Sequence, residues 1–200
     1  MSRRMILNAT AIAVAVALAA TALALSPVNL NAQEGDSPTC NGLTATIIGT
    51  DGDDVLQGTF RDDVIVGLGG NDTITGASGN DTICGGDGAD IIDGQSGADV
   101  IFGGEGNDRI RGSSGDDVID GGPGNDFLEG NAQDDTIHGG DGDDDINGGS
   151  DNDSLDGGNG IDVLDGLWQT DTCDDAETAI RCETITNDGC LLYTSPSPRD

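Results

Sequence analysis

The chain has 200 residues, of which 38 are Asp or Glu and only seven are Lys or Arg, so its formal net charge is −31 at pH 7. This charge excludes a nucleic-acid-binding protein, which needs a basic surface, and no basic amphipathic segment indicates membrane lysis. Aromatic residues make up only 2% of the chain and glycine occurs 34 times, so the chain either has a thin core or is an acidic, disordered tail.

The amino-terminal segment differs in kind from the rest. Arg3 and Arg4 precede an apolar stretch over residues 11–25, a pattern that predicts a secretory signal peptide over residues 1–32. The stretch is shorter than the roughly 20 residues of a spanning helix, which favours a removable signal over a retained anchor. Cleavage after Ala24 and after Ala32 both remain open. We therefore expect a secreted, extracellular protein that is not inserted in a membrane once the signal is removed.

A linker over residues 33–48 leads into a repeat that runs without insertion or deletion from Gly49 to Asp165. Each unit opens on Gly, has Asp at its sixth place and carries Ile or Leu at its eighth. Self-similarity at a nine-residue period indicates a solenoid. The thirteen units read GTDGDDVLQ, GTFRDDVIV, GLGGNDTIT, GASGNDTIC, GGDGADIID, GQSGADVIF, GGEGNDRIR, GSSGDDVID, GGPGNDFLE, GNAQDDTIH, GGDGDDDIN, GGSDNDSLD and GGNGIDVLD.

These units resemble the RTX, or haemolysin-type, calcium-binding repeat GGxGxDxUx, in which U is a large apolar residue. The resemblance implies an all-β fold, a right-handed parallel β-roll with two repeats per turn. In such a roll, six-residue loops hold calcium and three-residue strands carry the apolar residue inward. The fourth-place Gly is replaced by Arg61, Gln133 and Asp151, so these three loops are the doubtful ones.

One large apolar side chain per unit predicts a single inward ladder. Alternation along a strand sends the seventh and ninth residues outward. The opening Gly is followed by a second Gly at an eighteen-residue spacing from Gly85 to Gly157, which supports two units per turn. The predicted ladder is Leu56, Ile65, Ile74, Ile83, Ile92, Ile101, Ile110, Ile119, Leu128, Ile137, Ile146, Leu155 and Leu164.

Charge repulsion within the repeat region points to a bound cation. Residues 49–165 contain 29 acidic side chains and three arginines, a net of −26, which would make a compact rod repel itself. Ca²⁺ takes six to eight oxygen ligands from carboxylates and carbonyls, so up to about eleven ions, one for each pair of loops two units apart, would offset most of this charge. Without calcium we expect the region to be disordered. The resemblance implies the ligand carboxylates Asp54, Asp63, Asp72, Asp81, Asp90, Asp99, Asp108, Asp117, Asp126, Asp135, Asp144, Asp153 and Asp162.

Four of the cysteines suggest disulfides, because we expect the chain to be exported. When the nine-residue frame is continued through residues 166–189, Cys173 and Cys182 both fall at the inward eighth place, where they could face each other in a carboxy-terminal cap. Cys40 and Cys84 are then left to pair. The frame extended backwards makes residues 40–48 a degenerate first unit, about 10 Å along the axis from Cys84, which is too far for a disulfide unless the cap bends back. A metal-thiolate site is the rival interpretation, but no CxxC motif supports it.

The carboxy-terminal residues divide into a cap and a foreign tail. Trp168, the only tryptophan, is expected to cover the exposed end of the apolar ladder. Residues 190–200, CLLYTSPSPRD, look like a translated sequencing-library adapter and are interpreted as non-native.

Motifs for catalysis are missing. His138 is the only histidine and occupies an outward place, and the sequence has no HExxH, GxSxG or phosphate-binding loop. We therefore expect a non-enzymatic calcium-binding protein that folds on meeting extracellular Ca²⁺, with a structural, adhesive or ion-buffering role and an unidentified cell-surface or matrix partner. The alternative is a calcium-dependent folding and export module of a larger secreted enzyme or toxin.

Overall fold

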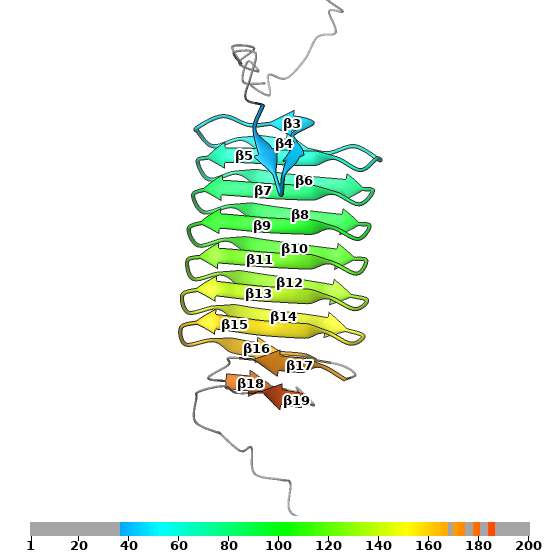
Figure 1. Cartoon of the computed structure of the whole chain (residues 1–200), viewed down its shortest axis with the longest axis vertical. Helices are drawn as coiled ribbons and strands as arrows, with labels where there is room; N and C mark the ends of the chain where they lie inside the picture. Colours follow the sequence, from blue (N-terminus) through cyan, green and yellow to red (C-terminus); the bar gives the residue numbers. More distant parts are fainter. Residues whose placement is uncertain (1–36, 168–169, 175–177, 181–183, 187–200) are drawn as a thin grey trace, which may run out of the picture.

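The computed structural model describes residues 37–167, 170–174, 178–180 and 184–186. All regular structure in these ranges is β-strand, arranged as two parallel sheets and one small hairpin. The strands alternate between the two sheets and stack along one axis as a solenoid (Figure 1). The expected all-β roll with two units per turn is confirmed. The predicted signal peptide over residues 1–32 and the tail over residues 190–200 lie outside the described residues.

Consecutive units alternate between an eight-stranded and a nine-stranded sheet. The eight-stranded sheet consists of β4 (Val55–Gln57), β6 (Thr73–Ser78), β8 (Ile91–Ser96), β10 (Arg109–Ser114), β12 (Phe127–Ala132), β14 (Asp145–Ser150), β16 (Val163–Asp165) and β18 (Thr178–Ile180). The nine-stranded sheet consists of β3 (Ile47–Ile48), β5 (Val64–Gly69), β7 (Thr82–Asp87), β9 (Val100–Glu105), β11 (Val118–Pro123), β13 (Thr136–Asp141), β15 (Ser154–Asn159), β17 (Thr172–Asp174) and β19 (Thr184–Thr186). Neighbouring strands pair eighteen residues apart over most of each sheet, as in the register Ile92 to Ile110 to Leu128.

The apolar ladder is the core. Its members from Ile65 to Leu164 are at most 1% exposed, and Ile47 and Leu56 pack against them at the amino-terminal end. Outward residues such as Val55, 84% exposed, and Val118, 44% exposed, alternate with them. The predicted inward and outward places are therefore confirmed, because a strand presents successive side chains to opposite faces.

Most strands are twice as long as the repeat implied. They cover six residues, because ladder pairing continues from the ninth place into the first three residues of the next unit, as in Ser113 to Gln95 and Ser114 to Ser96. Every second-place residue from Leu68 to Leu167 has a positive φ, including the non-glycines Ala77 and Asn131. The chain thus bends within a paired segment, and the expected three-residue strands are wrong.

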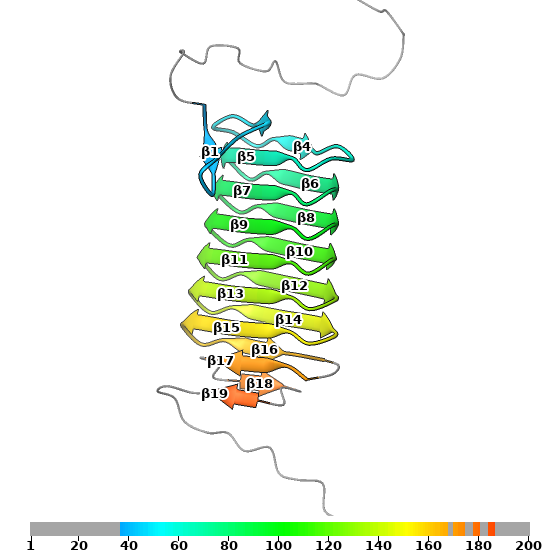
Figure 2. The same ribbon diagram turned by 45° about the vertical axis from the view of Figure 1, so that its right-hand side comes forward.

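The amino-terminal cap is a hairpin and not a repeat unit. β1 (Thr39–Cys40) and β2 (Leu43–Thr44) pair antiparallel, and β1 lies across β5 in the nine-stranded sheet (Figure 2). The hairpin returns along the outer face of the roll, where Val66 is only 6% exposed. Only Ile47–Ile48 follows the nine-residue frame, so the degenerate unit predicted over residues 40–48 is wrong in its first part.

The returning hairpin removes the distance problem of the first disulfide. Cys40 and Cys84 are bonded, with their Cα atoms 5.8 Å apart, within the usual range for a disulfide. Cys40 is 1% exposed. The bond therefore ties the cap to β7, two turns into the roll.

The nine-residue frame ends at Cys173. This residue is buried, pairs in register with Leu155, and is disulfide-bonded. The next step is shorter, because Ala179 pairs with Leu164 and Ile185 pairs with Cys173. The register thus gives Ala179 the place beside Leu164 that the frame predicted for Cys182. Cys182 and Trp168 lie outside the described residues.

Candidate metal centre: two columns of buried carboxylates

The sixth-place aspartates form two columns, one at each edge of the roll. Each precedes a strand, and all strands within a sheet are parallel, so the aspartates that lead into one sheet align at one edge. The first column, leading into the eight-stranded sheet, is Asp54, Asp72, Asp90, Asp108, Asp126, Asp144 and Asp162. The second column, leading into the nine-stranded sheet, is Asp63, Asp81, Asp99, Asp117, Asp135, Asp153 and Asp171.

Burial separates most of these carboxylates from water. From Asp72 to Asp162 they are at most 3% exposed, Asp63 is 8% exposed and Asp54 is half-buried. Asp171, also buried, extends the second column and was absent from the predicted ligands. Its signal was in the sequence, since the frame continued past Asp165 places it sixth in its unit.

From Asp72 to Asp171, one oxygen of each column carboxylate has a fixed partner. The Oδ1 atom accepts the backbone N–H of the aspartate one turn earlier, so that Asp90 N–H donates to Asp108 and Asp108 N–H donates to Asp126, both at 2.8 Å. The same contact recurs along both columns at 2.7 to 2.9 Å. Hydrogen bonding to a carboxylate favours its charged form.

The second oxygen, Oδ2, is buried without a hydrogen-bond donor in ten of these side chains. Burying an unsatisfied charged oxygen is costly, so a run of such atoms points to a missing cationic partner. The ten are Asp72, Asp81, Asp90, Asp99, Asp108, Asp117, Asp126, Asp135, Asp144 and Asp153.

The opening glycine of most units packs directly against this oxygen, so that no Cβ fits there. A Cβ atom on Gly121 would lie 2.4 Å from Asp126 Oδ2 and 2.6 Å from the carbonyl oxygen of Gly139. A carboxylate oxygen and a backbone carbonyl of the next turn therefore lie close together on the same side of the glycine. Oxygen donors of these two kinds are the ligands that Ca²⁺ prefers. Among the described residues, no three His, Cys, Asp or Glu side chains gather as a metal site; each loop offers one sixth-place carboxylate together with carbonyls.

Burial raises the pKa of the column carboxylates from Asp72 to Asp153. Desolvation is the largest cause, opposed by the backbone hydrogen bond and reinforced in most of them by neighbouring aspartates, and it raises the pKa of Asp81 to about 6, of Asp117 to about 7 and of Asp135 to about 8. Keeping these buried carboxylates ionised near neutral pH therefore destabilises the fold when no counter-charge is present. Either protons or cations must neutralise them.

Two of the three doubtful loops keep the common backbone. Gln133 and Asp151 replace the fourth-place Gly yet have φ values of 82° and 83°, in the left-handed region that Gly adopts in neighbouring units. Asn and Asp tolerate this region better than most residues, so Asp151 suits this place better than Gln133 does. Arg61 is not among the residues with positive φ.

A second polar ladder, not anticipated from the sequence, joins the same loops. The fifth-place side chain accepts the backbone N–H of the residue one turn later, as when Asn71 N–H donates to Asp53 Oδ1 and Ala89 N–H donates to Asn71 Oδ1, both at 2.8 Å. This direction is opposite to that of the sixth-place ladder. Its signal was present, since the fifth place is Asn or Asp in ten of the thirteen units. Together the two ladders set the spacing of the loops on neighbouring turns.

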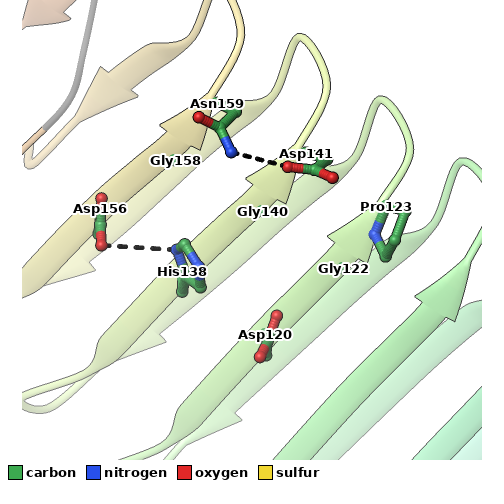
Figure 3. Close-up of a pocket in the computed structure, with 9 residues that line it drawn as sticks. All are labelled: Asp120, Gly122, Pro123, His138, Gly140, Asp141, Asp156, Gly158 and Asn159. Atoms are coloured by element: carbon green, nitrogen blue, oxygen red, sulfur yellow. Dashed lines mark hydrogen bonds and ion pairs between the residues drawn. The ribbon is translucent and has the colours of Figure 1, made fainter.

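A groove on the outer face of the nine-stranded sheet shows no catalytic arrangement. It has a volume of about 530 Å³ and lies between the ninth-place row with His138 and the third-place row with Pro123, over a floor of glycine (Figure 3). His138 Nδ1 is 3.6 Å from Asp156 Oδ2, and both side chains are nearly half exposed. The residues that line the groove include no Ser, Cys or Lys nucleophile. His138 is outward, as predicted.

The fold and the columns together define a repetitive parallel β-solenoid whose loops offer oxygen ligands to a hard cation. The family model of the RTX calcium-binding nonapeptide repeat matches residues 48–83, 85–119, 93–128, 120–155 and 148–174. These matches cover more than half of the chain, which therefore belongs to the RTX calcium-binding repeat family. No curated protein matched the chain. No helix among the described residues is long and apolar enough to cross a bilayer.

Proposed function

We propose that the protein is secreted and that its roll folds outside the cell when Ca²⁺ occupies the loops of the two columns. The product is a non-enzymatic rod with a structural, adhesive or ion-buffering role. The observation that carries the proposal is the set of ten buried carboxylates whose Oδ2 atoms have no donor.

Neutralisation of the columns is the proposed driving force. Each turn of the roll brings two more aspartates out of water, and burial raises their pKa. A divalent ion removes this cost and bridges successive turns, so binding free energy becomes folding free energy. One ion for each pair of adjacent loops at an edge gives up to about eleven for the thirteen units of residues 49–165, and the loop of Asp171 adds one further pair.

The disulfide supports an extracellular location. Cys40 and Cys84 are joined, and disulfides persist in oxidising compartments. The expected signal peptide over residues 1–32 supplies the route. Fusion of residues 1–32 to a reporter enzyme tests this part, and retention of the reporter inside the cell would contradict it.

A calcium titration tests the folding proposal. Far-ultraviolet circular dichroism of the purified protein should change from a disordered to a β spectrum as Ca²⁺ rises into the millimolar range. Mg²⁺ should substitute poorly, since it demands a smaller and more regular octahedral shell. A chelated sample with the same spectrum and melting temperature as the loaded one would refute the proposal.

A further inference from the structure

The first two loops of the roll differ from all later ones at their second residue. This residue is Thr50 in the first unit and Thr59 in the second, and no other unit has Thr there. Neither threonine has the positive φ found at every later second place from Leu68 onwards. The backbone of the two loops therefore follows a different course.

The two threonines hydrogen-bond to the carboxylate oxygen that lacks a donor elsewhere. The backbone N–H and the Oγ1 hydroxyl of Thr50 donate to Asp54 Oδ2 at 2.6 and 2.8 Å. Those of Thr59 donate to Asp63 Oδ2 at 2.7 and 2.8 Å. Each of these Oδ2 atoms thus has two donors, whereas the same atom has none in Asp72 and Asp81.

A threonine also lies beside the other oxygen of Asp63. The hydroxyl of Thr46 is 3.3 Å from Asp63 Oδ1 and 3.1 Å from the carbonyl oxygen of Val64, so these two acceptors share its one proton, and the same hydroxyl accepts the N–H of Val64 at 2.9 Å. Thr46 thus takes the place that an earlier turn would have beside Asp63. Two N–H or O–H dipoles that point at a carboxylate oxygen satisfy its charge and present positive hydrogens where a cation would have to approach.

We propose that Thr50 and Thr59 close the first two loops with hydrogen bonds in place of calcium, so that Asp54 and Asp63 are not metal ligands. The inference rests on the proposed calcium-dependent folding of the later turns and assigns that dependence to the loops from Asp72 onwards. The first turn, tied by the Cys40–Cys84 disulfide to β7, is then a metal-independent end on which calcium-loaded turns stack.

Counting bound calcium separates the two kinds of loop. The double variant Asp54→Asn with Asp63→Asn should bind as many ions per chain as the parent, measured by equilibrium dialysis and atomic emission. The matched variant Asp108→Asn with Asp117→Asn changes one residue in each of the same two columns, three turns further along, and should bind about two fewer. An equal loss in the two variants would overturn the inference. A parent chain that binds no calcium would refute the proposed function as well.

Hydrogen exchange of the unmodified full chain provides a test that needs no variant. In calcium-free buffer, the backbone amides of Thr50 and Thr59 should exchange at least tenfold more slowly than the second-place amides of Ser113 and Asn131. Replacing both threonines by Val, which removes the hydroxyl and keeps the shape, should reduce this difference without changing the calcium count. If the amides of Thr50 and Thr59 exchanged as fast as those of Ser113 and Asn131 in the parent chain, the first turn would not be independent of metal.

Discussion

Replacing one column carboxylate by its neutral amide should have opposite effects with and without calcium. Asp126 is 3% exposed, accepts the N–H of Asp108 on Oδ1 at 2.8 Å, and has no donor on Oδ2. Burial, as the largest cause, raises the pKa of Asp126 to about 7 from an ordinary 3.8. In Asp126→Asn the amide oxygen can accept the same N–H, while the buried negative charge is removed.

The size of the effect follows from that pKa. Raising the pKa from 3.8 to about 7 corresponds to about 4 kcal/mol of unfavourable free energy for the buried charge above pH 7, and relaxation of the loop around the charge reduces this to the order of 2 kcal/mol. The calcium-free roll of Asp126→Asn should therefore be more stable than the parent by about 2 kcal/mol at pH 7.5. With calcium saturating, the variant loses a charged ligand and should be less stable.

Urea unfolding, followed by circular dichroism, measures the change in stability both without and with calcium. The calcium-free arm includes an osmolyte, which favours the compact state, so that a folded baseline exists. Asp145→Asn is the matched control, because Asp145 is an exposed outward residue on the strand that follows Asp144, and it should behave alike in both arms. If Asp126→Asn shifted the urea midpoint in the same direction with and without calcium, the assignment of this carboxylate to a cation site would be wrong.

Three further predictions concern the core, the opening glycine of a unit and the effect of pH. Ile110→Ala removes a fully buried member of the ladder and should lower the free energy of unfolding of the calcium-loaded roll by about 2 to 5 kcal/mol, whereas Val118→Ala on the outer face should cost under about 1 kcal/mol. Gly121→Ala places a Cβ 2.4 Å from a column carboxylate and should lower calcium affinity and stability in a calcium titration, while Gly52→Ala, whose Cβ would meet no atom within 4 Å, should not. Because burial raises the pKa of the column carboxylates from Asp72 to Asp153, to about 8 for Asp135, the calcium-free fold binds more protons than the unfolded chain and gains stability as pH falls from about 8 towards 4. Circular dichroism should show β structure growing on acidification without calcium, while calcium affinity weakens over the same range; a calcium-free spectrum that lost β structure on acidification would contradict this sign.

The spacing of turns along the roll axis predicted the stacked fold correctly, but it gave the wrong distance between Cys40 in the cap and Cys84. Cys84 lies two turns from the position that a stacked first unit would give Cys40, and that separation argued against their bond. The chain avoids it with an antiparallel hairpin at Thr39–Thr44 that returns along the outer face. The repeat pattern cannot predict such a reversal, because the pattern stops where the hairpin begins.

The carboxy-terminal register shows the same limit. The frame placed Cys182 inward, yet Ala179 is the register partner of Leu164. Beyond Cys173 the repeated Gly and Asp residues are absent, so the sequence no longer requires nine residues per unit. The strands there still pair in register, with fewer residues between them.

The thirteen candidate ligands could be named from their place in the unit. Which of their oxygen atoms have hydrogen-bond donors could not. Thr at the second place sets the first two units apart in the sequence, but only the hydrogen-bond geometry shows that Thr50 donates to Asp54 and so closes the loop. The fifth-place ladder was likewise visible as a preference for Asn and Asp, while its direction required the positions of N–H groups one turn away.

Periodicity alone determined the solenoid, the inward residue of each unit and the two lines of aspartates, because an unbroken nine-residue repeat leaves a strand only one way to bury its single large apolar side chain. Hydrogen-bond geometry decided which carboxylates keep an oxygen without a donor, and strand pairing decided how far each strand extends and how both ends are closed. These features depend on the backbone conformation of each loop and on contacts with other turns, which the repeat pattern does not specify.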